Sequence, residues 1–346
     1  MILRVALIGF GNVGQEFARL LMRKRDWLVS SKGLDIEVRG IATRSKGALI
    51  SQRDIDLQKA LDVLESHGNL REYGDESVEM TPFEMIDNCD ADVVVEISPL
   101  NVSTGQPAID HISYALQSKM HVITANKGPI ALAYDQLESL AKSRDDKLRF
   151  EGTVMDGTPV FNLVEKTMQG CEILRIEGIL NSTSNYVMTE MAKGRSLEDA
   201  VKETQRKGIT EADPSLDLDG WDAAAKITAL ANVLMNAGST PQKVDRKGIR
   251  GLKSEDFEIA ARNGKKLKLV ARAEMADSEI RTSVAVEEIT TDSPFWSVDG
   301  TSGAVTISTD LMGDITILET NPQVTQTAYA ILSDLLLIVE WMRSNE

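Results

Sequence analysis

A dense run of acids followed by a lysine is the first stretch of this sequence that could do chemistry. Residues 211–226 read EADPSLDLDGWDAAAK. Five carboxylates precede Lys226, namely Glu211, Asp213, Asp217, Asp219 and Asp222. So many acids repel one another unless a cation binds among them or water screens their charge. The cation could be a metal ion, an amino group of a substrate, or Lys226 itself.

The spacing of Asp222 and Lys226 has an ordinary explanation beside the chemical one. Residues four apart on a helix share one face, so an exposed salt bridge would account for this pair. A calcium loop of the EF-hand type does not fit the spacing of the acids, whereas a metal of another geometry remains an alternative. A functional role is favoured because the acids cluster ahead of the helix and because Trp221 is a costly residue for a solvated loop.

A second lysine stands in HVITANKGPIALA, residues 121–133. Asn126 and Lys127 follow an apolar run at 120–124 and precede Gly128 and Pro129, which is the pattern of a strand-to-helix turn. The carboxyl ends of parallel strands are where doubly wound folds bind their ligands. We therefore expect Lys127 to lie near a cofactor; the alternative is an exposed turn lysine.

The start of the sequence carries a glycine pattern typical of dinucleotide binding. An apolar run and an amphipathic helical pattern flank the hexapeptide Gly9, Phe10, Gly11, Asn12, Val13 and Gly14. In such a turn Gly9 permits the bend, Gly11 lets backbone N–H groups approach a pyrophosphate, and Gly14 lets helix and strand pack closely. The helix N-terminus would add the positive end of its dipole. A glycine turn without a ligand is the alternative.

The end of the second predicted strand bears on the choice between NAD and NADP. An NAD site usually places Asp or Glu there to hold the ribose 2′-hydroxyl. This sequence reads GIATRSKG over 40–47, with Arg44 and Lys46 and no acid. A guanidinium suits a 2′-phosphate, so NADP(H) is favoured and NAD(H) stays possible. Surface charges on a loop are the alternative explanation.

The elements that must position these residues change character near residue 150. Before it, apolar runs alternate with helical patterns, which predicts a Rossmann-type, doubly wound parallel sheet of the α/β class. The expected strands are 2–8, 36–42, 91–97, 120–124 and 148–150, and the expected helices are 12–28, 54–66, 105–118 and 130–144. After it, an α+β domain is expected, with strands at 172–180, 267–275 and 280–287 and helices at 183–193, 196–207 and 220–237. Residues 211–219 and most of 238–264 are expected to be loop, and a last helix covers about 322–342.

The totals exclude several classes of function. A length of 346 residues suggests two domains. A net charge of −15 argues against nonspecific binding to nucleic acid or to an anionic membrane. The two cysteines, Cys89 and Cys171, have no metal or redox spacing. We find no signal peptide before the strand at Ile2 and no apolar stretch long enough to span a membrane, so a cytoplasmic protein is expected.

These pieces together resemble the homoserine dehydrogenase family, over most of the chain. The resemblance rests on GFGNVG, TANKGP at 124–129, FEGTVMDGTP at 150–159, GILNSTSNYVMTEM at 178–191 and ITEADPSLDLDGWDAAAK at 209–226. It implies NAD(P)(H)-dependent interconversion of L-homoserine and L-aspartate 4-semialdehyde in threonine and methionine biosynthesis. It also implies a homodimer made through the sheet of the second domain and a C-terminal helix that returns to the nucleotide domain.

The expected domains are therefore a nucleotide-binding domain over 1–150, a substrate-binding and dimerisation domain over 151–312, and a C-terminal segment over 313–346. The chain resembles the short members of the family, which lack a threonine-sensing domain, so we expect no threonine inhibition through such a domain.

The resemblance assigns functional roles residue by residue. It implies that Lys127 and Lys226 are the functional lysines. The substrate-holding residues would be Glu211, Asp217, Asp222 and Thr183. Ser98 and Asn126 would contact the cofactor, as would Lys127. A monovalent cation, sodium, would bind at Glu151, Val154, Asp156 and Thr158, where Met155 and Asp156 replace the glycines usual in that loop.

The chemistry explains why the family uses these residue types. Carboxylates bind the substrate's α-ammonium through charge-assisted hydrogen bonds. A lysine ammonium near the aldehyde oxygen stabilises the developing alkoxide and donates a proton as hydride arrives. Because Asp222 favours a charged neighbour, we assign proton donation to Lys226 and the proton relay to Lys127. The rival interpretations are another two-domain NAD(P)-dependent amino-acid or hydroxy-acid dehydrogenase, and a catalytically inactive nucleotide sensor.

Overall fold

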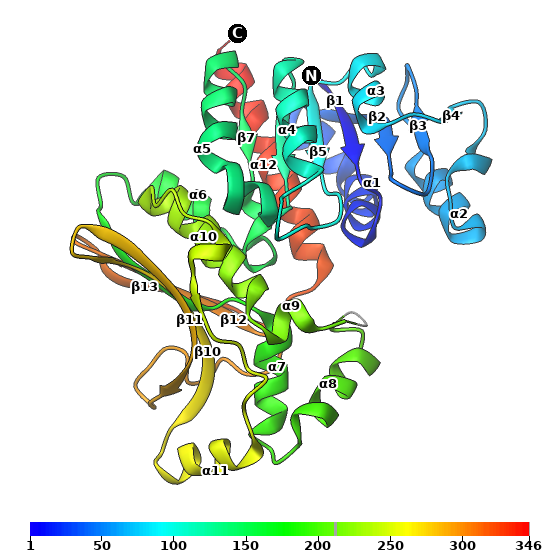
Figure 1. Cartoon of the computed structure of the whole chain (residues 1–346). Coiled ribbons are helices and arrows are strands. Elements are labelled where there is room, and N and C mark those ends of the chain that lie inside the picture. The colour runs from blue at the N-terminus through cyan, green and yellow to red at the C-terminus, as the bar shows by residue number, and fades with distance from the viewer. Residues whose placement is uncertain (211–212, 346) are drawn as a thin grey trace. The chain divides into compact units, whose positions relative to one another are not determined.

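The computed structural model describes residues 1–210 and 213–345 and divides the chain into two compact units. One unit consists of Met1–Thr158 together with Gln323–Glu346, and the other of Pro159–Pro322. Each unit has its own sheet (Figure 1). Among the helices in the described ranges, none is long and apolar enough to cross a membrane.

The first unit is built on a seven-stranded sheet in the order β4-β3-β2-β1-β5-β6-β7. The strands are β1 (Ile2–Ile8), β2 (Asp35–Ala42), β3 (Ala48–Ile50), β4 (Ser77–Val78), β5 (Val93–Glu96), β6 (His121–Thr124) and β7 (Leu148–Arg149). The five strands β2, β1, β5, β6 and β7 run parallel to one another. Strands β3 and β4 add an antiparallel edge next to β2. The central strands are apolar and buried on both faces, as a parallel sheet between helical layers requires.

Helices connect most of these strands, and the last helix, α12, joins them from the end of the chain (Figure 1). They are α1 (Asn12–Lys32), α2 (Leu57–His67), α3 (Pro82–Asn88), α4 (Ala108–Gln117), α5 (Lys127–Arg144) and α12 (Val324–Ser344), with 3-10 turns η1 (Arg71–Tyr73), η2 (Glu151–Thr153) and η3 (Met155–Gly157). The last helix, α12, packs on α1 and on the η2–η3 segment. Its residues Ile331, Leu335 and Ile338 belong to the same apolar core as Leu3 and Leu7 of β1. The final helix therefore completes the core of the unit that begins the chain.

The second unit is an α+β unit on a six-stranded sheet in the order β13-β12-β8-β10-β11-β9. Its strands are β8 (Ile173–Ile179), β9 (Asp245–Arg246), β10 (Lys266–Ala276), β11 (Glu279–Ile289), β12 (Gly303–Thr309) and β13 (Gly313–Glu319). Its helices are α6 (Val160–Thr167), α7 (Ser182–Met191), α8 (Leu197–Arg206), α9 (Ser215–Leu218), α10 (Trp221–Met235) and α11 (Ser254–Arg262), with a 3-10 turn η4 (Pro241–Lys243). All strand pairs are antiparallel except β9 with β11.

Most elements with a clear periodic pattern are confirmed, whereas several short elements and the β12–β13 hairpin were missed. The predicted strands and helices of the first 150 residues correspond to β1, β2, β5, β6, β7, α1, α2, α4 and α5, and the later ones to β8, β10, β11, α7, α8, α10 and α12. The prediction that 211–219 is loop throughout is wrong, because α9 forms one short helix there; residues 211–212 lie outside the described ranges. The prediction omitted β3, β4, β9, α3, α6, β12 and β13.

Candidate active site

Lys226 and Asp222 form a largely buried pair at the start of α10. The helix begins after Gly220, which takes a left-handed φ of 78°, and the two side chains lie four residues apart on it. Lys226 Nζ is 3.2 Å from Asp222 Oδ2 and donates a hydrogen bond of 2.7 Å to the carbonyl oxygen of Leu180. Only 12% of either side chain is exposed. The exposed surface salt bridge that the spacing alone allowed is therefore not what forms here.

Asn181, which the sequence analysis did not single out, joins the acids of the cluster. Its Nδ2 atom donates to Asp217 Oδ1 at 2.7 Å and to Asp222 Oδ2 at 2.9 Å. Its Oδ1 atom accepts from the backbone N–H of Ser184 at 2.7 Å and so caps α7. One side chain thus ties the beginning of α7 to α9 and to α10.

Several neighbouring groups shift the pKa of the Asp217 carboxyl. Burial raises the pKa of its carboxyl, and the nearby charge of Asp222 raises it further. Hydrogen bonds from Asn181 and Thr183 and the charge of Lys226 act in the opposite direction. Thr210 Oγ1 adds a hydrogen bond of 3.2 Å to Asp217 Oδ2. Two carboxylates therefore share one ammonium in a partly desolvated position, which favours binding of a further cationic group.

The outer acids of the segment have partners within the chain. Asp219 pairs with the guanidinium of Arg250, which also donates to Ser215 Oγ at 2.9 Å. Asp213 accepts from the backbone N–H of Ser215 at 3.0 Å. Of these outer acids, Asp219 is thus neutralised by a cation, whereas Asp217 and Asp222 form the inner pair around Lys226. Glu211, the remaining predicted acid, lies outside the described residues.

Trp221 has a structural role beside this cluster. The guanidinium carbon of Arg246 lies 3.8 Å from the centroid of the indole ring, and Arg246 also donates to the carbonyl oxygen of Asp219. Stacking of this kind is favourable by about 0.5–2 kcal/mol. Arg246 and Arg250 were not predicted, because they occur in a stretch interpreted as loop and lie more than 20 residues after the last acid of the run.

The glycine turn of the first unit has the geometry that close packing requires. Gly9 has a φ of 111°, and a Cβ atom there would lie 2.4 Å from the carbonyl oxygen of Ile97. A Cβ on Gly14 would lie 2.9 Å from the carbonyl oxygen of Gly9. A Cβ on Gly11 would meet nothing within 4 Å. Gly9 and Gly14 are thus required by the protein's own packing, whereas Gly11 leaves open space before α1, which suits close approach of a pyrophosphate.

The other residues of the hexapeptide lie around this turn. Phe10 is buried in the core of the unit, Val13 packs against that core, and Asn12 is exposed at the first position of α1. The first turn of α1 carries no acid, so its free N–H groups and dipole face no competing negative charge on the helix.

Ser98, Asn126 and Lys127 lie at the carboxyl edge of the parallel sheet. Asn126 Nδ2 donates to the carbonyl oxygen of Ser98 at 3.2 Å, and Asn126 Oδ1 accepts from the N–H of Gly128 at 3.1 Å. Lys127 is half-buried and is the first residue of α5. The hydroxyl of Ser98 is buried and has no hydrogen-bond partner in the described part of the chain. A buried hydroxyl in this state suits a polar group of a bound ligand.

The loop between β2 and β3 displays two basic residues. Thr43 organises it, since its hydroxyl donates to the carbonyl oxygen of Gly47 and accepts from the N–H of Lys46, both at 2.8 Å. Arg44 is exposed and Lys46 is half-buried. No acid occurs in residues 40–47.

The predicted cation loop follows β7. Glu151 is buried, and its N–H donates to Asp334 Oδ2 of α12 at 2.9 Å. Val154 is also buried, and Asp156 takes a left-handed φ of 49°. The N–H of Thr158 donates to the carbonyl oxygen of Met155 at 2.8 Å. Within the described ranges, no group of three or more His, Cys, Asp or Glu side chains could hold a metal, so a cation here would depend on carbonyl oxygens.

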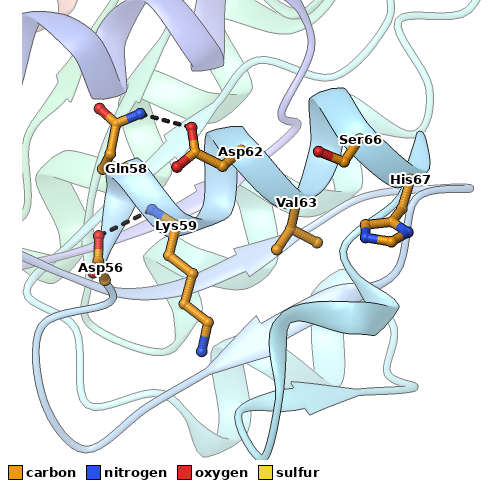
Figure 2. A pocket seen from close by; sticks show the side chains of 7 residues that line it. All are labelled: Asp56, Gln58, Lys59, Asp62, Val63, Ser66 and His67. Carbon is orange, nitrogen blue, oxygen red and sulfur yellow. Dashed lines mark hydrogen bonds between the residues drawn. The ribbon is translucent and has the colours of Figure 1, made fainter.

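An open pocket on the outer side of α2 contains none of the predicted site residues. Its volume is about 290 Å³, and Figure 2 shows that its lining comes from α2 and the residue before it. The lining residues are Asp56, Gln58, Lys59, Asp62, Val63, Ser66 and His67. Its acids and base interact locally: Gln58 donates to Asp62 at 2.8 Å, and Lys59 lies over the ring of Tyr73. We regard it as a surface feature.

A glycine turn in the first βα unit and a carboxylate–lysine cluster in an α+β unit are features of a two-domain nicotinamide-dependent dehydrogenase. The family model for homoserine dehydrogenase matches residues 159–336, and the model for the NAD-binding domain of homoserine dehydrogenase matches residues 9–151. The chain therefore belongs to the homoserine dehydrogenase family, and it is an NAD(P)-dependent oxidoreductase acting on a CH–OH group.

Individual relatives extend over nearly the whole chain. Homoserine dehydrogenase of Methanocaldococcus jannaschii is 38% identical, covering 96% of this chain and 98% of that protein. NAD(+)-dependent homoserine dehydrogenase of Pseudomonas canavaninivorans is 34% identical, covering 97% and 96%. The structure of a hyperthermophilic archaeal homoserine dehydrogenase in complex with NADPH is similar with a TM-score of 0.83 and 30% identity, covering 98% of each chain.

Proposed function

We propose that this protein interconverts L-aspartate 4-semialdehyde and L-homoserine with NADP(H), as a step of threonine and methionine biosynthesis in the cytoplasm. The observation that carries the proposal is the inner acid pair, Asp217 and Asp222, bridged by Asn181 beside a single lysine. Two carboxylates with one ammonium leave a net negative charge in a partly buried position. The α-ammonium of an amino-acid substrate would neutralise that charge.

Each predicted residue has a role in this scheme. Asp217 and Asp222, together with Glu211, bind the substrate ammonium, and the neighbouring Thr183 contacts the substrate. Lys226 is held by Asp222 and by the carbonyl oxygen of Leu180, contacts that favour the ammonium form. In the reducing direction Lys226 donates a proton to the aldehyde oxygen, and Lys127 relays protons. The bound nicotinamide would supply the hydride.

The residues of the first unit support a preference for NADP(H) over NAD(H). One relative is named NAD(+)-dependent and one similar structure is a complex with NADPH, so membership of the family does not decide the cofactor. Arg44 and Lys46 stand after β2, where an NAD site usually has an acid. Gly9, Phe10, Gly11, Asn12, Val13 and Gly14 form the phosphate turn in this scheme, and Ser98 and Asn126 face the cofactor with Lys127.

One assay tests both the reaction and the cofactor. Oxidation of NADPH by aspartate semialdehyde is followed at 340 nm and repeated with NADH. We expect turnover with both and a larger kcat/KM with NADPH. A larger kcat/KM with NADH would overturn the cofactor assignment. No turnover with either, combined with turnover of another amino acid or hydroxy acid, would favour the rival dehydrogenase.

The division of labour follows the two halves of the chain. Residues 1–150 would hold the cofactor, and 151–312 would hold the substrate and the dimer interface. Of the segment 313–346, the part from Gln323 onward belongs to the nucleotide-binding unit, whereas β13 stays in the sheet of the second unit. A homodimer through the sheet of the second unit would cover the face of β10 that lies outside the core. Ala271 and Ala273 are fully buried, whereas Arg272, between them, is partly exposed and pairs with Glu177 and Glu287. Light scattering should give a mass near twice 37.9 kDa, and a monomer would contradict the proposal.

A sodium ion bound at Glu151, Val154, Asp156 and Thr158 is the last part of the proposal. The left-handed backbone at Asp156 turns carbonyl groups in directions that a regular element does not allow, which suits coordination by backbone oxygens. Turnover should rise on adding sodium to protein dialysed against a tetramethylammonium salt at constant ionic strength. Equal turnover in both salts would contradict a functional sodium site.

A further inference from the structure

Asn181 stands at the corner where β8 leads into α7, and this corner contacts Lys226 and the two inner acids. The carbonyl oxygen of the preceding residue, Leu180, accepts from Lys226, and the amide of Asn181 donates to Asp217 and Asp222. Asn181 is 6% exposed. Its two acidic partners lie 36 and 41 residues further along the chain.

The orientation of the Asn181 amide is fixed by its neighbours. A backbone N–H can only donate, so the oxygen of the amide must face Ser184. The NH₂ group must then face the acids, and each of its two hydrogens has one carboxylate as acceptor. A flipped amide would place its oxygen against two carboxylates and leave the α7 N–H unpaired. Helix capping and acid bridging are thus two functions of one side chain.

The hydrogen bonds from Asn181 to Asp217 and Asp222 favour the ionised form of both carboxyls. Asp217 faces Asp222 and Lys226 from α10, Asn181 and Thr183 from the start of α7, and Thr210 from the preceding loop. Hydrogen bonds to an ionised carboxylate stabilise that form, whereas burial and the neighbouring carboxylate oppose it. Among these groups, Lys226 is the one cation, and it lies against Asp222.

We propose that Asn181 is a positioning residue that keeps Asp217 and Asp222 side by side in their ionised forms, ready for the substrate ammonium. The proposal rests on the proposed function for the identity of the substrate. The effect of Asn181 on the ionisation of the two acids is independent of the substrate, because it exists in the substrate-free protein.

Three variants separate the bridge from the helix cap. Ser and Asp both cap helices well, so Asn181→Ser and Asn181→Asp retain the cap of α7. Ser is too short to reach both acids, and Asp replaces the donor with a third carboxylate. Asn181→Ala removes both functions. Asn185→Ser is a control on the same helix, since the Asn185 amide donates only to the carbonyl oxygens of Val298, Gly300 and Ser302.

The kinetic experiment is the pH dependence of KM for homoserine. For Asn181→Ser we expect KM to rise about 10- to 100-fold near neutral pH, the size of a lost hydrogen bond to a charged group. The acid limb should move to higher pH in Asn181→Ser and further in Asn181→Asp, with KM for NADP unchanged. Asn185→Ser should lower the melting temperature and leave the acid limb in place. Wild-type KM and acid limb in both the Ser and the Asp variants would overturn the proposal.

A second measurement needs no turnover. Carbon-13 NMR of aspartate carboxyls, with Asp217 assigned from the Asp217→Asn spectrum, gives the pKa of Asp217 in the substrate-free protein. We expect this pKa to be higher in Asn181→Ser than in wild type. An unchanged value would overturn the proposal even if wild type oxidises homoserine. A raised value in a protein inactive toward homoserine would support the bridge while contradicting the proposed substrate.

Discussion

The Nζ atom of Lys226 and the Oδ2 atom of Asp222 lie 3.2 Å apart, four residues apart on α10, with 12% of each side chain exposed. Lys202 and Glu198 on α8 have the same spacing and an Nζ–Oε1 distance of 2.6 Å, yet 64% and 78% of their side chains are exposed. Water screens the exposed pair, which therefore contributes little to the stability of its helix. The buried pair requires compensation for desolvation, and its surroundings provide it through Leu180 and Asn181.

Removing the lysines should separate chemistry from packing. Lys226→Met and Lys127→Met are each expected to lower kcat by about 10²- to 10⁴-fold, the range typical of a lost proton donor or relay. Lys202→Met serves as the control, since it removes a lysine of the same helical spacing from an exposed pair. The measurement is the pH–rate profile of each variant. Near wild-type turnover in Lys127→Met or Lys226→Met would contradict a catalytic role for that lysine.

Asp217→Asn is expected to weaken substrate binding and to stabilise the fold. Burial and the charge of Asp222 raise the pKa of Asp217, so the native state binds this proton more tightly than the unfolded state does. The ionised carboxylate therefore destabilises the fold above its raised pKa, and this penalty disappears as pH falls through the raised value toward the ordinary one. The variant should melt higher than wild type near pH 7, and the difference should shrink toward about pH 4.

Calorimetry across that pH range checks the sign of the effect. A variant less stable than wild type at neutral pH would show that the hydrogen bonds of Asp217 outweigh its desolvation. The variant should also raise KM for homoserine by about 10-fold or more, because a charge-assisted hydrogen bond to the ammonium is lost.

Arg44→Ala should change cofactor choice without changing stability. The side chain is exposed, so its removal costs little in packing. If the guanidinium binds a 2′-phosphate, KM for NADPH should rise about 10- to 100-fold and KM for NADH should stay constant. Arg262→Ala, in an exposed pair with Glu258 on α11, is the control. Equal increases in KM for NADPH and for NADH would show that Arg44 does not bind the 2′-phosphate.

The glycines of the phosphate turn should respond differently to the same substitution. Gly9→Ala places Cβ 2.4 Å from a backbone oxygen at a left-handed φ, and should destabilise the fold by about 1–3 kcal/mol. Gly11→Ala meets no atom within 4 Å, so its melting temperature should stay close to wild type while KM for NADPH rises. Thermal unfolding and cofactor titration of both variants check this. A destabilised Gly11→Ala variant would show that Gly11 serves packing instead.

Sequence periodicity predicted those elements whose pattern lies within their own residues. Residues 2–8 form β1 as expected, because a mostly apolar run that leads into a glycine turn suits a buried parallel strand. Strands β3 and β4 have only three and two residues, which is too short for a periodic pattern to show. The β12–β13 hairpin follows an aperiodic stretch at 290–302 and was missed with it.

The sequence singled out Asp217, Asp222 and Lys226, which the structure brings together, but not the side chain that connects them. Asn181 ahead of a helix is a cap signal that sequence reasoning could have used. Its bonds to α9 and α10 depend on tertiary packing across 36 and 41 residues, which no local pattern encodes. The stacking of Arg246 on Trp221 likewise joins residues 25 positions apart, given their numbers in the sequence.

The packing of α12 into the core of the first unit has a consequence for biosynthesis. On a ribosome that adds roughly 5–20 residues per second, the 164 residues of Pro159–Pro322 take about 8–33 s to emerge before α12 can be made. During that time Leu3, Leu7 and Phe17 lack their apolar partners Ile331, Leu335 and Ile338. The second unit is continuous in sequence and can fold meanwhile. The first unit is thus the first to be synthesised and the last to complete its core. A chain arrested before Val324 should expose the apolar residues of that core to chaperones.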